Sequence, residues 1–405
     1  MGGKRALAAV LFTAAAWGQG FLTRQGRTVF PIGSYELPVA DEELAAMSKA
    51  GFNLVRCRNR ADLDRAARAG MLGWVSVPMQ LGADGKLRAL IDGVREHSAL
   101  AVWEGPDEIV WNFTAFSGLH RSGIYKHPDE WWRQTPEALR YAEGEAARLM
   151  PKLREGAALI RRLDSRNLPL WINEAARSDL KFIRQYLGEI DITGCDIYPI
   201  HANSRKPAET AGSTDRYRAV GKGKPVWMVL QGFAWGELQG RDEPVAYPTF
   251  AETRLMAWAA IAHGARGILY WGMNASKPQP AFRESIYAMA AELAALQPFL
   301  TAPEMPGVRV KVIDGAEGRP VSAFCRSLGG EWLIALVNEA GTPCMGVEVS
   351  GLDALNGRGL ELLYGSEIAA VREGELIVRL MPHEVKVFAT GRGWEARRAG
   401  RDFGK

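Results

Sequence analysis

The stretch Leu100-Ala-Val-Trp-Glu-Gly-Pro-Asp-Glu108 decides how the rest of the chain is interpreted. Its first residues form a short apolar run that is typical of a buried strand, and the Gly-Pro pair ends that strand. Three carboxyl side chains gather there, those of Glu104, Asp107 and Glu108. Because α/β barrels place their chemistry at the carboxyl ends of their strands, the stretch predicts a barrel with an acidic site.

Strand-like and helix-like runs alternate eight times before residue 300. The predicted strands are 28–36, 51–56, 71–79, 99–104, 168–173, 190–198, 225–233 and 265–273. Eight such units match a (β/α)8 TIM barrel in size and order. A doubly wound open sheet is the main alternative, but no G-x-G-x-x-G phosphate loop follows the first strand. The barrel is expected over 27–303, with Pro151 kinking or dividing its long helix at 136–163.

The character of the chain changes after Pro306. Short runs that alternate apolar and polar residues fill 306–391, and Gly or Pro separates many of them. This pattern is typical of an antiparallel β-sandwich. The predicted fold class is therefore α/β, a TIM barrel followed by a small antiparallel β-sandwich, with a tail at 392–405.

The first residues are typical of an export signal. Lys4 and Arg5 precede an apolar run at 6–16, and small residues surround Trp17. The sequence predicts a signal peptide at 1–18 and a secreted or periplasmic protein, with a short buried helix as the alternative. The run is too short to span a bilayer, and no other segment is long and apolar enough, so no membrane contact is expected after cleavage.

Charge and cysteine content exclude several classes of protein. Much of the formal net charge of +4 lies at the two ends of the chain, and the body offers no basic surface suited to nucleic acid. Cys57 and Cys195 end apolar runs, which favours buried free thiols, whereas Cys325 and Cys344 lie in adjacent segments and could pair. No Cys-x-x-Cys or clustered His pattern indicates a metal site, and no cofactor is expected.

Polar and aromatic residues collect at the predicted carboxyl ends of the barrel strands. Carboxylates can act as acid, base or nucleophile, amides bind hydroxyl groups, and aromatic rings stack on sugars. Because the set contains only one basic side chain, it fits carbohydrate chemistry better than phosphate chemistry. The set comprises Glu36, Arg56, Gln80, Glu104, Asp107, Glu108, Asn173, Glu174, Asp196, Tyr198, Gln231, Trp271 and Asn274.

The motifs at these strand ends resemble those of the clan A glycoside hydrolases, a superfamily of TIM barrels. Many members read Trp-Glu-x-x-Asn-Glu at strand four, and the segment from Trp103 to Glu108 keeps that spacing. The segment from Gly51 to Arg56 is similar to the second-strand Gly-x-Asn-x-x-Arg. Trp271 resembles the strand-eight Trp beneath the sugar, and a C-terminal sandwich is a common companion of these barrels.

The resemblance implies roles for individual residues. Glu108 would be the general acid/base, its pKa raised by charged neighbours. Trp271 would form the floor of the sugar site. The remaining candidates are a catalytic group, Glu104 and Asp196, and a substrate-binding group, Glu36, Arg56, Asp107, Tyr198, Gln231 and Asn274.

One position departs from the family pattern. The segment from Lys224 to Gln231 matches strand seven, where the nucleophilic Glu is expected, and an amide cannot form the glycosyl-enzyme ester. Four alternatives stay open. The nucleophile comes from elsewhere, with Glu237, Glu36 or Asp196 as candidates; the enzyme inverts, across a gap of roughly 6.5–9.5 Å; the substrate assists; or the protein binds glycans without cleaving them.

The sequence thus predicts an exported glycoside hydrolase that cleaves O-glycosidic bonds in an oligo- or polysaccharide. The alternative is a non-catalytic carbohydrate-binding protein on a degenerate barrel. A long aromatic connection after the acidic stretch carries Trp111, Trp131 and Trp132, which either stack on sugars or pack the loop.

Overall fold

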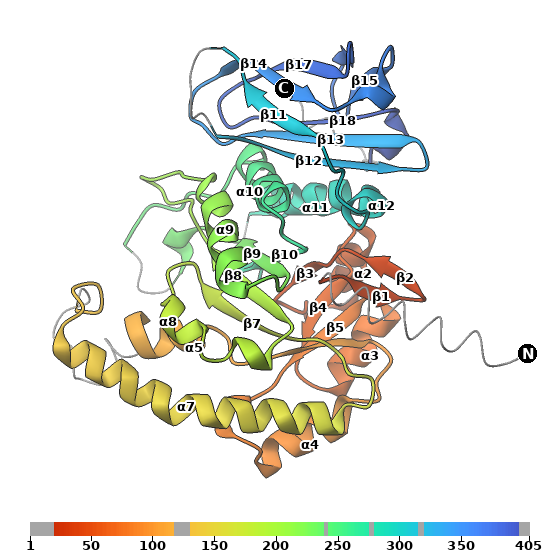
Figure 1. Cartoon of the computed structure of the whole chain (residues 1–405). Helices are drawn as coiled ribbons and strands as arrows, with labels where there is room; N and C mark the ends of the chain where they lie inside the picture. Colours follow the sequence, from red (N-terminus) through yellow and green to blue (C-terminus); the bar gives the residue numbers. More distant parts are fainter. Residues whose placement is uncertain (1–19, 117–129, 239–241, 275–278, 315–319, 397–405) are drawn as a thin grey trace, which may run out of the picture.

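The computed structural model describes residues 20–116, 130–238, 242–274, 279–314 and 320–396, so the predicted signal peptide at 1–18 lies outside them. Eight parallel strands close into a barrel in the order β10-β3-β4-β5-β6-β7-β8-β9 (Figure 1), which confirms the predicted TIM barrel. The strands are β3 Ile32–Ser34, β4 Leu54–Cys57, β5 Leu72–Ser76, β6 Leu100–Glu104, β7 Leu170–Ala175, β8 Ile192–Ile197, β9 Val226–Gln231 and β10 Gly267–Trp271.

Helices cover the outside of the barrel between successive strands (Figure 1). Several begin at a side-chain cap, since Asn59, Asp84 and Thr135 each accept an N–H bond from the first helical turn. Among the described helices, none is long and apolar enough to cross a membrane. The helices are α2 Asp41–Lys49, α3 Arg60–Arg68, α4 Gly85–Val94, α5 Ile109–Trp111, α7 Pro136–Leu163, α8 Leu180–Ile183, α9 Glu209–Gly221, α10 Phe250–Ala262, α11 Pro280–Ala295 and α12 Gln297–Leu300.

Helix α7 corrects one expectation. It runs as a single helix across Pro151, so of the two predicted effects, a kink or a division, the division is wrong. A proline inside a helix removes a backbone donor and strains the preceding turn. Leu149, Met150 and Leu153 are all buried around Pro151, so packing against the barrel holds both halves of the helix in place.

Aromatic rings fill the interior of the barrel. Trp171 lies 6.1 Å from Trp74 and 5.3 Å from Trp227 between ring centroids, and Tyr35 contacts Trp74 at 5.3 Å. A hairpin of β1 Leu22–Arg24 and β2 Arg27–Val29 precedes the barrel; the sequence prediction missed it and merged β2 with the first barrel strand. The barrel is therefore a packed scaffold whose chemistry belongs at the strand ends.

The C-terminal part forms the predicted sandwich and packs on α10 (Figure 1). The suggested pairing of Cys325 with Cys344 is wrong, because both are free thiols on strands of different sheets. One sheet contains β11 Arg309–Val312, β14 Cys344–Ser350 and β17 Glu375–Leu380. The other contains β12 Val321–Leu328, β13 Glu331–Asn338, β18 Val385–Ala389, β15 Gly359–Leu362 and β16 Ile368–Ala370.

A buried ion pair joins the barrel to the sandwich. Arg254 of α10 pairs with Glu292 of α11 at 2.9 Å, and its Nη1 donates to the Val385 carbonyl of β18 at 2.6 Å. Trp258 Nε1 donates to the same Glu292 carboxylate at 2.9 Å. Because the helices involved follow β9 and β10, the sandwich braces the side of the barrel that carries those strands.

Candidate active site

A cavity of about 630 Å³ opens at the carboxyl ends of β6 to β10. Its wall follows the barrel order, from Trp111 after β6 to Trp271 on β10, with Asp196 of β8 between them. This is the end of the barrel where active sites are found. Further lining side chains are those of Glu108, Arg177, Tyr198, His201, Lys206, Phe233, Trp235 and Leu238.

Glu108 occupies an unusual backbone position. Its φ of 49° lies in the left-handed region that residues other than glycine rarely adopt. The Glu108 N–H donates to the Asn173 carbonyl at 2.9 Å, which ties the loop after β6 to β7. Glu174 of β7 then accepts the N–H groups of Val110 at 2.9 Å and Trp111 at 3.3 Å. Strained residues of this kind persist only where their surroundings hold them, and they cluster at functional sites.

The carboxyl group of Glu108 is hydrogen-bonded to that of Asp196. Burial, followed by the charge of Asp196, raises the pKa of Glu108 to about 11. Burial also raises the pKa of Asp196, to about 6, while hydrogen bonds from Glu108 and Tyr198 favour its ionised form. Near neutral pH the shared proton therefore resides on Glu108 and the negative charge on Asp196.

A second group of carboxylates surrounds Arg56. Glu104 is 0% exposed, accepts a hydrogen bond from Ser76 Oγ, and lies 3.2 Å from Arg56 Nε. Burial raises the pKa of Glu104 to about 7, against the effect of Arg56. Asp107 accepts a hydrogen bond from Asn173 Nδ2 at 3.0 Å, and burial raises its pKa as well. Arg56 is thus already engaged by protein groups rather than free to hold a ligand alone.

Glu36 and Trp271 lie next to each other at the junction of β3 and β10. Glu36 Oε1 accepts the Gly272 N–H at 2.7 Å, and burial raises the pKa of Glu36 to about 7. The Trp271 ring stacks on Tyr198 with centroids 5.6 Å apart and planes at 28°. Asn274 is exposed and stands outside the group of residues that lines the cavity.

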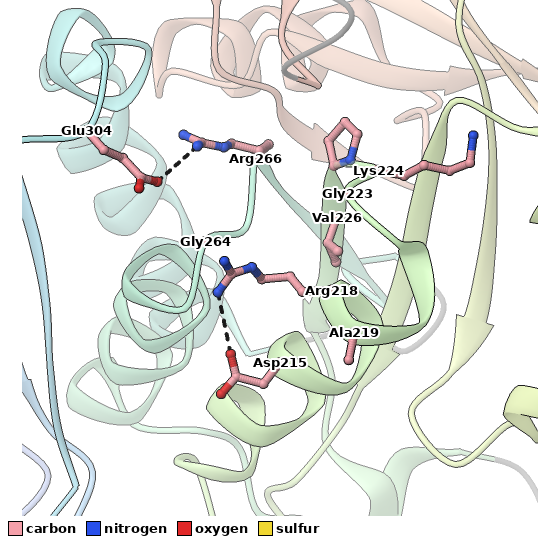
Figure 2. A pocket seen from close by; sticks show the side chains of 10 residues that line it. Asp215, Arg218, Ala219, Gly223, Lys224, Val226, Gly264, Arg266 and Glu304 are labelled. Atoms are coloured by element: carbon pink, nitrogen blue, oxygen red, sulfur yellow. Dashed lines mark hydrogen bonds and ion pairs between the residues drawn. The ribbon is translucent and has the colours of Figure 1, made fainter. Parts of the chain in front are cut away.

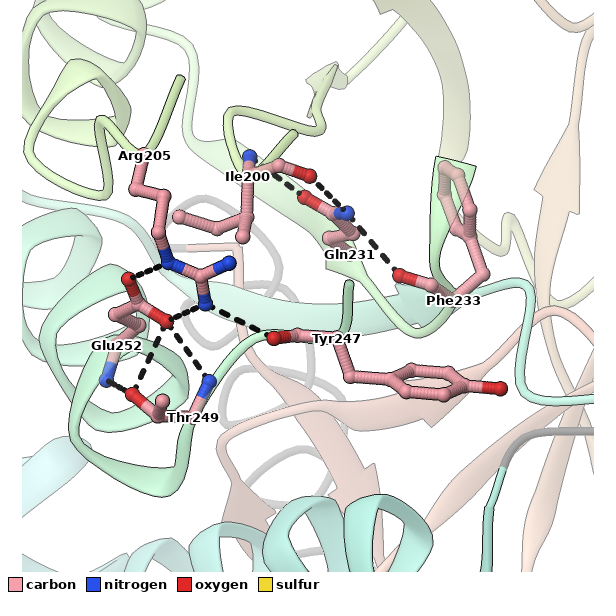
Figure 3. Close-up of polar contacts among 7 residues, drawn as sticks. All are labelled: Ile200, Arg205, Gln231, Phe233, Tyr247, Thr249 and Glu252. Atoms are coloured by element: carbon pink, nitrogen blue, oxygen red, sulfur yellow. Dashed lines mark hydrogen bonds and ion pairs between the residues drawn. The ribbon is translucent and has the colours of Figure 1, made fainter. Parts of the chain in front are cut away.

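Gln231 is bound to backbone on every side. Its Oε1 accepts the Ile200 N–H at 3.0 Å, and its Nε2 donates to the carbonyls of Ile200 at 2.9 Å and Phe233 at 3.1 Å (Figure 3). The side chain is 0% exposed and does not line the cavity. The hydrogen bonds of Gln231 therefore connect the loop after β8 to the end of β9, and its amide is not available to a ligand.

Glu237, another candidate nucleophile, lies in the segment after β9 and does not line the cavity. Its carboxylate accepts a hydrogen bond from Tyr247 OH. The Tyr247 carbonyl accepts from Arg205 Nη2 at 2.9 Å, and Arg205 also pairs with Glu252 in the capping box of α10 (Figure 3). The loops after β8 and β9 are thereby fixed to each other and to α10.

A second cavity, of about 560 Å³, lies at the opposite end of the strands (Figure 2). Pro225 and Val226 line it where β9 begins, and its arginines are paired, Arg218 with Asp215 and Arg266 with Glu304. In TIM barrels this amino-terminal end serves stability rather than chemistry. The first cavity is therefore the candidate active site.

The sequence did not reveal several contributors to the site. Ser76 bonds Glu104, and His201 stacks on Trp235 with centroids 4.9 Å apart and planes at 6°. Phe233 contacts Tyr198 at 5.0 Å, and the aromatic residues directly after β9 were the available signal for this wall. In the described part of the chain, no group of three His, Cys, Asp or Glu side chains is arranged to hold a metal ion.

A family model described as β-galactosidase, glycoside hydrolase family 42, matches residues 147–291. No curated protein sequence matches the chain. Among solved structures, a family 42 β-galactosidase from G. stearothermophilus is similar at 10% identity, with 89% of this chain and 98% of that chain covered and a TM-score of 0.56. A β-galactosidase from Rahnella gives 11% identity, 91% and 99% coverage, and a TM-score of 0.52.

A β-galactosidase from a psychrophilic Marinomonas gives 14% identity over 66% of this chain and a TM-score of 0.47, and this chain spans only 60% of its length. The solved structures share the fold, and the family model adds the sequence signal. Together they confirm the predicted resemblance to glycoside hydrolases, and the fold of the chain is the expected TIM barrel with a C-terminal β-sandwich.

Proposed function

We propose that the chain is an exported glycosidase that hydrolyses O-glycosidic bonds in an oligo- or polysaccharide, with Glu108 as the general acid. The observation that carries the proposal is the carboxyl pair, in which Glu108 keeps its proton near neutral pH and lines an aromatic cavity. A protonated carboxyl in this place can donate to the leaving oxygen as its bond to the anomeric carbon breaks. Export rests on the signal-like sequence at 1–18.

Asp196 acts as a positioning residue in this mechanism. Its hydrogen bond to Glu108 brings the two carboxyl groups closer than the roughly 5–5.5 Å that separates the catalytic pair of retaining enzymes, so no sugar fits between them. Its charge instead keeps the proton on Glu108. Glu104 is fully buried and acts through Arg56, which it holds, rather than by contact with the sugar.

Glu36 is the second carboxylate of this mechanism, either as nucleophile or as the base that activates water; it lies beside the cavity, next to Trp271 and Gly272 of its β10 edge, and not in its lining. Strands β3 and β6 are three apart in the barrel, the same separation as β6 and β9, which carry the catalytic pair in the family that the motifs resemble. One Glu36 oxygen is fixed by Gly272, and the other is buried without a partner among the described residues. A pKa of about 7 suits a base that works near neutral pH.

The description of the matching family makes β-galactosides the first substrates to test. A pyranose has an apolar face that stacks on an aromatic ring, and Trp271 with Tyr198 offers such a floor in the cavity. The alternative function is a carbohydrate-binding protein without catalysis, which Gln231 favours because it occupies the family's nucleophile position.

Replacement of the acid should remove activity without unfolding the protein. We expect Glu108→Gln to lower kcat/KM on 4-nitrophenyl and oligosaccharide β-galactosides by about 10²–10⁴-fold, because the amide cannot donate the proton that the leaving oxygen needs. The control is Glu137→Gln, an exposed carboxylate of α7. Full activity of Glu108→Gln would exclude Glu108 as the acid, and binding without hydrolysis by the unmodified protein on a broad glycoside panel would favour the carbohydrate-binding alternative.

The pH profile should depend on Asp196. A general acid works only while it is protonated, and the charge of Asp196 raises the pKa of Glu108. Asp196→Asn removes that charge, so the alkaline limb of the kcat/KM profile should move to lower pH by about one unit or more. The control Asp92→Asn, an exposed residue of α4, should keep the original limb. An unshifted limb in Asp196→Asn would contradict the proposed coupling.

Restoring a carboxylate on strand seven should not restore the family's nucleophile. In Gln231→Glu the new carboxylate would face two carbonyl oxygens that now accept from Nε2, so the free energy of unfolding should fall by about 2–3 kcal/mol. Activity should not rise. Denaturant unfolding and glycosidase assays measure both effects, with Gln25→Glu in the exposed β1–β2 turn as the control. A gain in activity would show that this position reaches the substrate.

A further inference from the structure

Two tryptophans extend the cavity beyond Glu108. Trp111 lines the cavity three positions after Glu108, at the end of α5. The ring of Trp132 lies beside it, with centroids 5.9 Å apart and planes at 45°. Trp132 is 49% exposed, so its ring is accessible from solvent. The two rings form a surface, here called the Trp111–Trp132 surface, that continues from the cavity toward solvent.

The neighbouring tryptophan shows what a purely structural role looks like on the same segment. Trp131 is 2% exposed and packs on Phe182 of α8 with ring centroids 6.3 Å apart. It therefore anchors the segment that precedes α7, and Trp132 is not needed for that purpose. The contrast separates one tryptophan that holds the segment from one that the segment presents to solvent.

The positions of the groups along the cavity wall indicate on which side of Glu108 the leaving group would lie. Trp271 closes the β10 end of the wall, Asp196 of β8 follows in the barrel order, and Glu108 and Trp111 stand together at the β6 end. The general acid of a glycosidase contacts the oxygen between the reacting sugar and the leaving group. With the reacting sugar on Trp271, a leaving group that contacts Glu108 lies at the end of the cavity where Trp111 is, and Trp132 lies beside Trp111.

We infer that the Trp111–Trp132 surface is a subsite for the leaving part of a glycan chain, with one sugar over Trp111 and the next over Trp132. This inference rests on the proposed function, and it adds a substrate class: oligosaccharides of at least three sugar units rather than disaccharides or small aryl glycosides. The rings offer apolar faces to pyranose rings, and the tilt between them follows a chain that turns from one sugar to the next.

The test compares chain lengths in a protein that cannot consume its ligand. Calorimetric titration of Glu108→Gln with β-1,4-linked galactobiose and galactotriose should show the triose binding about tenfold more tightly, as one extra stacked ring provides. Adding Trp132→Ala should abolish this gain, and Trp132→Phe should restore most of it. Ile368→Ala, an apolar side chain of the sandwich that is 67% exposed, is the control and should change neither affinity.

Hydrolysis of β-galactosyl fluoride by the unmodified protein separates the two proposals, because this substrate has no leaving sugar. Equal affinity for biose and triose, or a gain that survives Trp132→Ala, overturns the subsite even if the fluoride is cleaved. A gain that depends on Trp132 supports the subsite, and if the fluoride then remains uncleaved, the catalytic proposal fails while the binding surface stands. Absence of binding by both oligosaccharides overturns the subsite as well.

Discussion

The hydrogen bond between the carboxyl groups of Glu108 and Asp196 is the contact on which the proposed chemistry depends. Two buried carboxyl groups this close cannot both ionise near neutral pH, so one must keep a proton. The left-handed backbone at Glu108 and the bond from its N–H to Asn173 turn its side chain toward β8. The fold thus combines a strained backbone and a buried carboxyl pair at Glu108. Both fit a residue that donates a proton.

The packed interior of the barrel makes such an arrangement stable. Trp74, Trp171 and Trp227 fill the space between the strands, and Tyr35 covers them at the end where the carboxylates lie. Burial on this platform raises the pKa of Glu104, Asp107 and Glu108 together. Arg56 offsets only part of the negative charge, which leaves the site biased toward retaining protons.

The sequence predicted the barrel because eight apolar runs of strand length alternate with helical ones. This pattern does not depend on the contacts of any single side chain. The expectation that barrels place their active sites at the carboxyl ends of the strands also identified four residues that line one cavity: Glu108, Asp196, Tyr198 and Trp271. It could not show that Glu108 meets Asp196, since that contact depends on a single left-handed residue. Nor could it show that Gln231 clasps the Ile200 backbone, because the partner lies in an irregular loop whose path no periodicity encodes.

The proposed mechanism requires that Glu108 holds a proton well above neutral pH. Infrared difference spectroscopy of the unmodified protein against Glu108→Gln at pH 9 measures this directly, because Glu36, Glu104 and Glu174, with pKa values of about 7, are ionised there. We predict a protonated carboxyl band at pH 9 that disappears in Glu108→Gln and weakens in Asp196→Asn. The absence of any Glu108-dependent carboxylic acid band at pH 9 would contradict it.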